Sequence, residues 1–242
     1  MKTTSRILGV IPARSGSKGI YNKNLKLLGG KPLIYYTIQA ALNARMLNTV
    51  IVSSDCFKIL QYAQQFAGIT VPFVRPKDLA SDVASSFDVV KHSLDFYSKF
   101  GCTFDFVMLL QPTSPFRSAD LIDRAAQYMI ASGADSLITV RKIPARFHPS
   151  WAFQAGEDGL HKVVENSGQL ISRRQDLPDN YYRDGKIYMA KTALIETGTL
   201  LGGKIASLLT EDEPDINIDT FSDWEMAQHH IHLWKNLQKE SC

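Results

Sequence analysis

Short apolar runs alternate with helical segments through the first half of the chain. The runs lack an internal alternation of apolar and polar residues, which indicates strands buried on both faces of a sheet. We predict strands at 6–11, 49–53, 71–74, 105–110 and 136–141, and helices at 32–46, 57–67 and 119–131. Strands separated by helices pair in parallel. The sequence therefore predicts an α/β fold with a doubly wound, mostly parallel sheet.

This rhythm breaks after Ile143. Residues 151–183 mix short apolar pieces with many polar residues, and a strand-like segment follows at 186–190. A last strand is predicted at 216–219. A last helix is predicted at 222–237 from the helical spacing of its apolar residues Trp224, Ala227, Ile231 and Trp234. We expect one domain over 1–242, with an excursion at about 151–209.

The composition excludes several classes of protein. The 242 residues are 45% hydrophobic, and 27 Lys and Arg balance 24 Asp and Glu to a net charge of +3, so no nucleic-acid partner is expected. Cys56, Cys102 and Cys242 are widely separated, which favours a reducing cytoplasm over a disulfide framework. The apolar run before Pro12 is too short for a signal or membrane segment, so we expect a cytoplasmic protein without a membrane partner.

A loop rich in Gly, Ser and basic residues follows the first predicted strand. It reads IPARSGSKG at 11–19 and NKN at 22–24. Ligands of α/β sheets bind where strands end, and glycines let backbone N–H groups face an anion. The basic side chains of Arg14, Lys18 and Lys23 would neutralise a nucleoside triphosphate. The spacing matches neither GxxxxGK[ST] nor GxGxxG, and the alternative is a solvated basic turn.

Several blocks in order extend this signal along the chain. They are RP at 75–76, LASDVASS at 79–86, LQPTSPFR at 110–117, RQDLP at 174–178, GKIY at 185–188 and IDT at 218–220. Together with IPARSGSKGIYNKN they resemble the N-acylneuraminate cytidylyltransferases, the CMP-sialic acid synthetases. The resemblance spans residues 6 to about 230. It implies a nucleotide-diphospho-sugar transferase fold, CTP and a nine-carbon sugar acid as substrates, and Mg²⁺ as cofactor.

The resemblance places CTP on the first half of the chain. Arg14 and Lys23 would hold the β- and γ-phosphates and stabilise the departing pyrophosphate, with Ser17 beside them. Asn24 suits a ribose hydroxyl. The predicted reader of the cytosine edge is the pair Arg75 and Ser86, for which loop capping is the alternative. Gln111, a polar amide at a strand end, would bridge ribose and sugar acid.

The predicted sugar site draws on the second half of the chain. Arg174 is the candidate partner of the acceptor carboxylate, because a guanidinium makes a two-pronged contact. Tyr188 would line the pocket, although a strand Tyr is as often core packing. Trp151 stands in HPSW, where well-known sialate enzymes carry a lysine after an HPL-type segment. The acceptor is therefore expected to be a related nonulosonate such as legionaminic or pseudaminic acid.

The predicted magnesium site lies near the C-terminus. Asp219 follows Asn217 by two residues, so both would point to the same face of the predicted strand. Family members carry two Asp here. Asn217 replaces the first, which leaves Asp219 as the principal ligand and Asp215 as a second candidate. The predicted catalytic residues are thus Arg14, Lys23 and Asp219.

Other departures and alternatives follow from the resemblance. Asp184-Gly-Lys186 replaces an NGA-type block, and Leu200-Leu201 replaces an aromatic pair that a partner subunit supplies in some members, so we expect a homodimer. Ser54-Asp55 is predicted to be a helix N-cap.

Two alternative functions are open. One is cytidylyl transfer to an eight-carbon sugar acid or a phosphopolyol, and the other is a non-catalytic nucleotide-binding module.

Overall fold

A seven-stranded sheet forms the centre of the computed structural model, which describes residues 5–16, 19–164 and 171–240. Its strand order is β11-β7-β10-β6-β1-β4-β5. The strands are β1 Ile7–Pro12, β4 Thr49–Ser53, β5 Ile69–Thr70, β6 Phe106–Leu109, β7 Ser136–Lys142, β10 Tyr181–Lys191 and β11 Ile205–Leu209. Only β10 runs antiparallel to its two neighbours. The predicted mostly parallel α/β sheet is confirmed.

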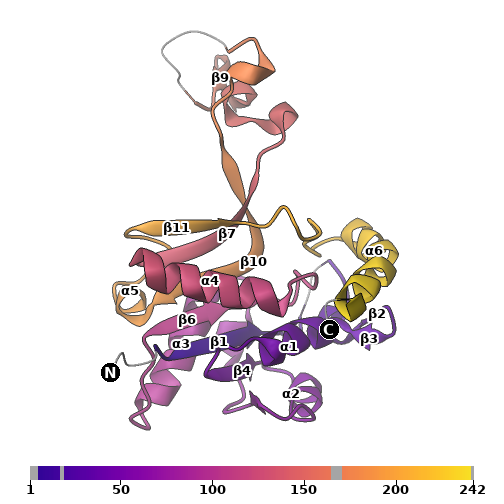
Figure 1. Cartoon of the computed structure of the whole chain (residues 1–242), viewed down its shortest axis with the longest axis vertical. Helices are drawn as coiled ribbons and strands as arrows, with labels where there is room; N and C mark the ends of the chain where they lie inside the picture. Colours follow the sequence, from indigo (N-terminus) through magenta and orange to yellow (C-terminus); the bar gives the residue numbers. More distant parts are fainter. Residues whose placement is uncertain (1–4, 17–18, 165–170, 241–242) are drawn as a thin grey trace.

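Helices cover both faces of this sheet (Figure 1). On one face lie α1 (Leu33–Asn43), α2 (Phe57–Ala63) and α4 (Ala119–Ser132), and on the other lie α3 (Ser86–Ser98) and α5 (Thr192–Glu196). Within β1, Ile7 and Ile11 pack on the first face, and Leu8 and Val10 pack on the second. This two-sided burial explains why the strands are continuously apolar.

A third apolar cluster holds the C-terminal helix α6 (Phe221–Glu240) beside the short hairpin of β2 (Leu27–Leu28) and β3 (Lys31–Pro32). The predicted stripe of Trp224, Ala227, Ile231 and Trp234 is buried in this cluster, as its spacing requires. The 3₁₀ turn η1 (Lys23–Leu25) precedes the hairpin. Among the described residues, no helix is both long and apolar enough to cross a membrane.

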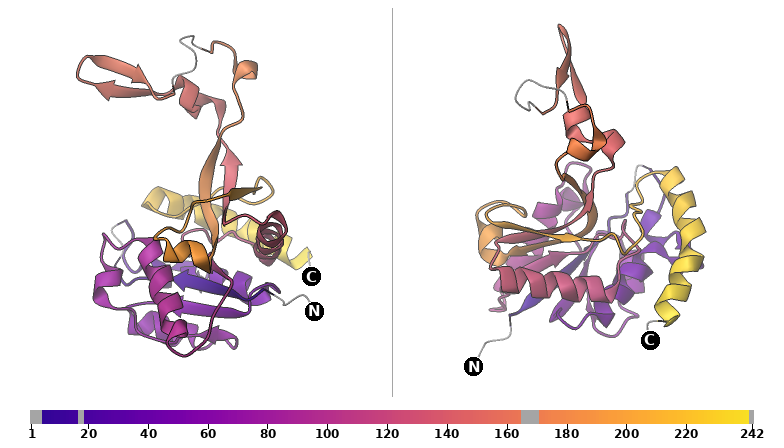
Figure 2. Two further views of the ribbon diagram at one scale, coloured as in Figure 1. Left: turned by 90° about the vertical axis from the view of Figure 1, so that its left-hand side faces the viewer. Right: turned by 45° about the horizontal axis from the view of Figure 1, so that its top comes forward.

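An arm projects from the sheet between β7 and β10 (Figures 1 and 2). It contains η3 (Ala145–Phe147), η4 (Pro149–Trp151), a hairpin of β8 (Phe153–Gly156) and β9 (Gly159–Lys162), and η5 (Arg174–Asp176). The arm therefore occupies 143–180. The excursion predicted for 151–209 extends too far, because 181–209 return to the main sheet as β10, α5 and β11.

Strand β10 carries a wide irregularity between Arg183 and Tyr188. Arg183 pairs with Val140 of β7 and Tyr188 with Ile138, so five steps along β10 match two along β7. Gly185 lies inside the irregularity with φ of 78°, a left-handed conformation that favours glycine. Such a bulge changes which side chains share a face of the strand.

Four local predictions need correction. Residues 71–74 form no strand, and the short β5 precedes them. Residues 216–219 form no strand either, although their burial alternates, with Ile216 and Ile218 buried and Asn217 and Asp219 exposed. The prediction omitted α3, whose N-terminus is closed by a capping box of Ser85 and Asp88. Ser54-Asp55 is no N-cap, because α2 follows Cys56 and Asp55 contacts another loop.

Candidate active site

A pocket opens where β1 and β6 end, at the carboxyl edge of the parallel strands. We call it the first pocket; its volume is about 270 Å³. The predicted site residues that line it are Arg14, Lys23, Asn24, Arg75, Ser86, Gln111 and Asp219. Four regions that lie far apart in the sequence meet here: 12–24, 75–89, 111–113 and Asp219. Ser17 and Lys18, which were predicted beside the phosphates, lie outside the described residues.

Hydrogen bonds on both sides of Arg14 fix the loop that follows β1. Arg14 Nη1 donates to the Asp82 carboxylate over 2.7 Å and to the Ser81 carbonyl over 3.1 Å. The amide of Asn24 donates to the Arg14 carbonyl over 3.0 Å. Asp55 accepts from the Ser15 backbone N–H and hydroxyl, which fixes the next residue of the loop. These contacts hold the loop around an open basic pocket.

Lys23 and Asp219 lie side by side in the lining of the first pocket. Lys23 Nζ donates to the Ile218 carbonyl over 2.6 Å and lies 3.4 Å from the Asp219 carboxylate. The Asp219 side chain is 65% exposed, whereas that of Lys23 is 11% exposed. Gly19 crosses directly over Asp219, because a Cβ placed on Gly19 would lie 2.2 Å from the Asp219 carbonyl oxygen. Only glycine lets the two segments approach this closely.

Arg75 is a buried cation whose hydrogen-bonding groups are not all satisfied. Its side chain is 4% exposed, and its Nε and Nη2 atoms have no hydrogen-bond partner. Burial lowers the pKa of the Arg75 guanidinium, opposed by the nearby Asp55 charge. Unpaired buried donors cost about 1 to 3 kcal/mol, so such a group in a pocket wall is suited to a ligand that brings acceptors.

A second pocket of about 460 Å³ adjoins the first. Ser86 and Gln111 line both pockets, and Gln111 Nε2 donates to the Ser86 hydroxyl over 3.3 Å. The other residues that line the second pocket are Leu109, Arg183, Gly185, Tyr188, Thr199, Leu200, Leu201 and Asn217. Tyr188, which was predicted for the sugar site, thus lines the second pocket. The shared wall allows two ligands to meet at Gln111.

Two predicted sugar-site residues lie on the arm instead. Trp151 belongs to η4, and its indole N–H donates to the Ile171 carbonyl, which ties two segments of the arm together. Arg174 is exposed in η5. Neither residue lines the first or the second pocket of its own subunit.

The predicted metal ligands are separated as well. Asp219 lines the first pocket, and Asn217 orients it by donating its amide N–H to the carboxylate over 2.9 Å. Asp215 accepts from the Tyr182 hydroxyl and pairs with Arg141 at 3.6 Å, outside the lining of either pocket. Among the described residues no three His, Cys, Asp or Glu gather into a metal cluster. A single carboxylate still fits Mg²⁺, which is often held by one or two carboxylates together with substrate phosphates.

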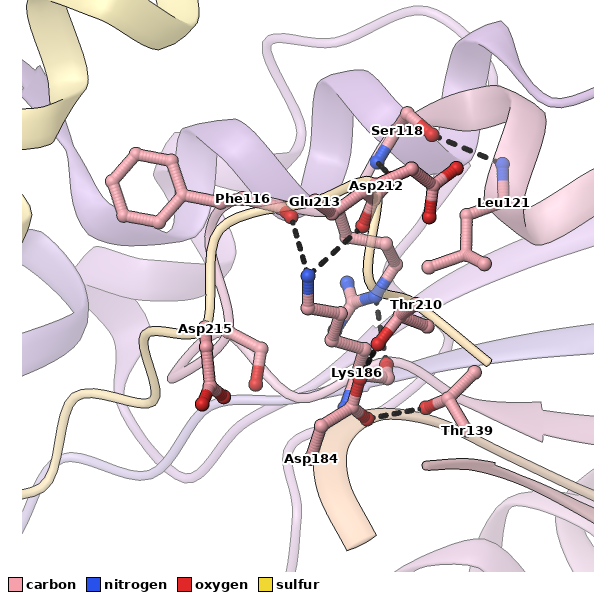
Figure 3. A network of polar contacts seen from close by, with 12 residues as sticks. Phe116, Ser118, Leu121, Thr139, Asp184, Lys186, Thr210, Asp212, Glu213 and Asp215 are labelled. Carbon is pink, nitrogen blue, oxygen red and sulfur yellow. Dashed lines mark hydrogen bonds and ion pairs between the residues drawn. The ribbon is translucent and has the colours of Figure 1, made fainter. Parts of the chain in front are cut away.

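A buried polar network surrounds Lys186 in β10 (Figure 3). Lys186 donates to Glu213 over 3.1 Å, and Glu213 also accepts from the Ser118 backbone N–H at the start of α4. Asp184 accepts from the hydroxyls of Thr139 and Thr210. The network joins the β10 bulge, the β7 strand and the segment that leads to Asp219.

Arg117 connects this network to Gln111. Its Nη2 donates to the Gln111 carbonyl over 2.9 Å and its Nε to the Lys186 carbonyl over 2.7 Å. Burial lowers the pKa of Arg117 to about 10, opposed by the Glu213 and Asp184 charges. Arg117 therefore remains a cation at neutral pH and positions Gln111, one of the two residues that line both pockets.

Sequence reasoning missed several of these residues. Asp55 and Asp82 position the loop around Arg14, but they lie far from this loop in the sequence and only the fold brings them to it. Lys186 and Glu213 lie far apart in the sequence. One signal was available for Arg183, because the turn-like dipeptide Asp184-Gly185 lies between it and the strand predicted at 186–190.

A family model described as Cytidylyltransferase matches residues 8–238. The chain belongs to this family. The predicted resemblance is thereby confirmed, and the first pocket of this cytidylyltransferase lies where α/β folds bind nucleotides.

Relatives of this cytidylyltransferase act on several sugar acids by name. CMP-N,N'-diacetyllegionaminic acid synthase of Legionella pneumophila is 35% identical over 94% of this chain and 97% of that protein. Pseudaminic acid cytidylyltransferase of Campylobacter jejuni is 31% identical over 91% of this chain and 94% of that protein. N-acylneuraminate cytidylyltransferase of Escherichia coli is 32% identical over 97% of this chain, which spans 54% of that longer protein.

The fold of this cytidylyltransferase is also found in solved structures. CMP:2-keto-3-deoxy-manno-octonic acid synthetase complexed with CTP superposes with a TM-score of 0.69, at 19% identity and over 95% of this chain and 99% of that one. The 4-diphosphocytidyl-2C-methyl-D-erythritol synthase of Anaerococcus prevotii gives a TM-score of 0.64 at 15% identity. These similarities concern the fold.

Proposed function

We propose that this cytidylyltransferase transfers CMP from CTP to a nonulosonic acid. The anomeric hydroxyl of the sugar acid attacks the α-phosphorus of CTP, the bond to the β-phosphate oxygen breaks, and pyrophosphate leaves. The hydroxyl proton is released. The protein contributes chiefly by holding the two reactants in line and by stabilising negative charge.

The observation that carries this proposal is the wall shared by the two pockets. Ser86 and Gln111 line both, so a nucleotide in the first pocket and an acceptor in the second would meet at Gln111. Arg14 and Lys23 also line the first pocket and supply positive charge that would stabilise the leaving pyrophosphate. A non-catalytic nucleotide-binding module would have no need of the second pocket.

The cytosine base is assigned to the inner wall of the first pocket. The unpaired Nε and Nη2 of Arg75 can donate to cytosine O2 and N3, and the Ser86 hydroxyl lies in the same pocket. The base would thereby satisfy donors that are buried without partners in the protein alone. With the base bound there, Asn24, which also lines the first pocket, would contact the ribose.

Magnesium fits the remaining corner of the first pocket. Asp219 would hold the ion together with the phosphates, and Asn217 and Lys23 orient its carboxylate. When bound, Mg²⁺ supplies positive charge that stabilises the triphosphate and its leaving group. Asp215 remains a predicted second ligand, although its contacts with Arg141 and Tyr182 give it another role.

The preferred acceptor is a legionaminic- or pseudaminic-type acid. Leu109, Leu200 and Leu201 give the second pocket an apolar side that suits acyl groups and a deoxygenated C9 methyl. The relatives named for these acids match 91% or more of the chain at 31 to 35% identity, which supports the assignment.

A homodimer in the cytoplasm is part of the proposal. The arm exposes the large apolar side chains of Phe147, Phe153, Leu160 and Val163. Exposed apolar clusters of this kind suit a subunit interface. Trp151 and Arg174 could then reach only the pocket of a partner subunit. No nucleic-acid or membrane partner is proposed.

The experiment that tests the proposal is a pyrophosphate-release assay with CTP, Mg²⁺ and a panel of acceptors. The panel contains N-acetylneuraminic, legionaminic and pseudaminic acids, an eight-carbon 2-keto-3-deoxy sugar acid and a polyol phosphate. We expect release with one of the nine-carbon acids. Release with the eight-carbon acid or the polyol phosphate alone would assign the chain to that activity, and no release with any acceptor would contradict the proposal.

A further inference from the structure

The second pocket has a distinctive charge. Among the described residues that line it, Arg183 is the only cation and no carboxylate is present. Its other polar groups are neutral: the hydroxyls of Ser86, Tyr188 and Thr199 and the amides of Gln111 and Asn217. A pocket with one guanidinium and neutral donors suits an anionic ligand.

The bulge in β10 is what aims Arg183 at this pocket. In a regular strand, residues five apart point to opposite faces. Here Arg183 lies opposite Val140 and Tyr188 opposite Ile138, and those two β7 residues share a face. Because directly paired residues point to the same side of a sheet, Arg183 and Tyr188 also share a face. The three extra residues of the bulge therefore bring both side chains to one pocket.

The bulge is held in place by buried contacts. Asp184 accepts from the Thr139 hydroxyl and from the Lys186 backbone N–H over 3.0 Å. The Gly185 Cα faces Ser114 and Asn217, because a Cβ there would lie 3.3 Å from the Ser114 hydroxyl. Arg183 thus projects from a rigid base. Burial raises the pKa of the Tyr188 hydroxyl, and the adjacent Arg183 charge opposes that rise.

The chemistry of the acceptor locates its acid group. In a 2-keto sugar acid the anomeric carbon bears both the attacking hydroxyl and the carboxylate. When the hydroxyl meets the α-phosphate of CTP, the carboxylate must therefore lie within a few bond lengths of the wall shared by the two pockets. Arg183 lines the second pocket together with Gln111 and Ser86, whereas Arg174 of the same subunit lies on the arm.

We infer that Arg183 binds the carboxylate of the sugar acid from within the same subunit. The inference rests on the proposed function, and it replaces Arg174 with Arg183 as the carboxylate partner. The guanidinium fork selects a planar anion next to the reacting hydroxyl, so Arg183 would distinguish a sugar acid from a neutral sugar of the same shape.

The test compares the acceptor acid with its C1 carboxamide, which keeps the shape and loses the charge. For Arg183→Ala we expect the KM for the acid to rise by about 10- to 100-fold, with the inhibition constant of the carboxamide nearly unchanged. Arg183→Lys should recover only part of the loss, because lysine keeps the charge without the fork. CTP affinity measured by calorimetry should stay as in the unmodified chain.

The same assay on Arg174→Ala separates the two arginines. Loss of the preference for acid over carboxamide in Arg174→Ala, with that preference kept in Arg183→Ala, would overturn the inference. An equal rise for acid and carboxamide in Arg183→Ala would overturn it too, because that result indicates a change of shape. Failure of the proposed function has another signature: the unmodified chain would release no pyrophosphate with any nonulosonic acid.

Discussion

Lys186 and Glu213 form an ion pair of 3.1 Å whose side chains are 1% and 5% exposed. Both residues come from segments that border the candidate site, and Glu213 also accepts from the N-terminus of α4. A charge pair buried this deeply has lost nearly all contact with water, so each partner depends on the other.

Replacing Lys186 alone should therefore destabilise the protein strongly. For Lys186→Met we expect a loss of about 3 to 5 kcal/mol in the free energy of unfolding, because the Glu213 carboxylate is left buried without its cation. The measurement is chemical denaturation. The double variant Lys186→Met, Glu213→Gln should recover much of the loss. Equal destabilisation of the single and double variants would show that the two charges do not depend on each other.

Asp219→Asn should abolish most turnover and leave the fold intact. The substitution keeps the shape and removes the carboxylate proposed for Mg²⁺, which should reduce kcat by about 10² to 10³, or about 3 to 4 kcal/mol. Thermal unfolding should shift little, because this side chain is 65% exposed. Asp215→Asn is the control and should be milder. If Asp215→Asn proved the more damaging variant, the metal ligand would be Asp215.

Gly19→Ala should disturb the same corner without touching a charged group. A Cβ at Gly19 would lie 2.2 Å from the Asp219 carbonyl oxygen, so the segment that carries Asp219 must move. We expect a raised Mg²⁺ requirement in the pyrophosphate-release assay. Gly16→Ala is the matched control, because no atom lies within 4 Å of its Cβ. Equal metal dependence of the two variants would argue against close packing of Gly19 on Asp219.

Arg75→Met should separate ligand binding from stability. The variant removes a guanidinium whose Nε and Nη2 are buried without partners, so thermal stability should be kept or increased. CTP affinity should fall at least about tenfold. The unmodified protein should prefer CTP over UTP by roughly 10⁴-fold, and Arg75→Met should lose much of that preference. A loss of stability that accompanied normal CTP binding would make Arg75 a structural residue.

The protein should be a homodimer joined through its arm. Leu160 on the β8-β9 hairpin is 71% exposed, and Leu160→Asp should shift the dimer toward monomer by placing a charge in the interface. Light scattering after size-exclusion chromatography measures the change. Phe100→Asp, an equally exposed site at 70% on the body, should leave the oligomeric state unchanged. A fully active monomeric unmodified protein would contradict the prediction.

Local patterns in the sequence determined most of the central architecture. The mostly apolar runs at 49–53 and 136–141 became β4 and β7, because burial on both faces of a sheet favours apolar residues on both sides of a strand. The loop at 11–24 was placed correctly at the end of the first strand. Its residue types already indicated an anionic ligand, since glycines and cations are local requirements of phosphate binding.

Only the tertiary structure decided which side chains meet. Arg183 and Tyr188 share a face because of a bulge whose register depends on β7, and Arg174 lies outside both pockets because it belongs to the arm. The fold also brings Lys186 into contact with Glu213 and Asp55 into contact with Ser15, although these partners lie far apart in the sequence. Periodicity is a property of neighbours along the sequence, whereas strand register and buried charge pairing are set by contacts between distant segments.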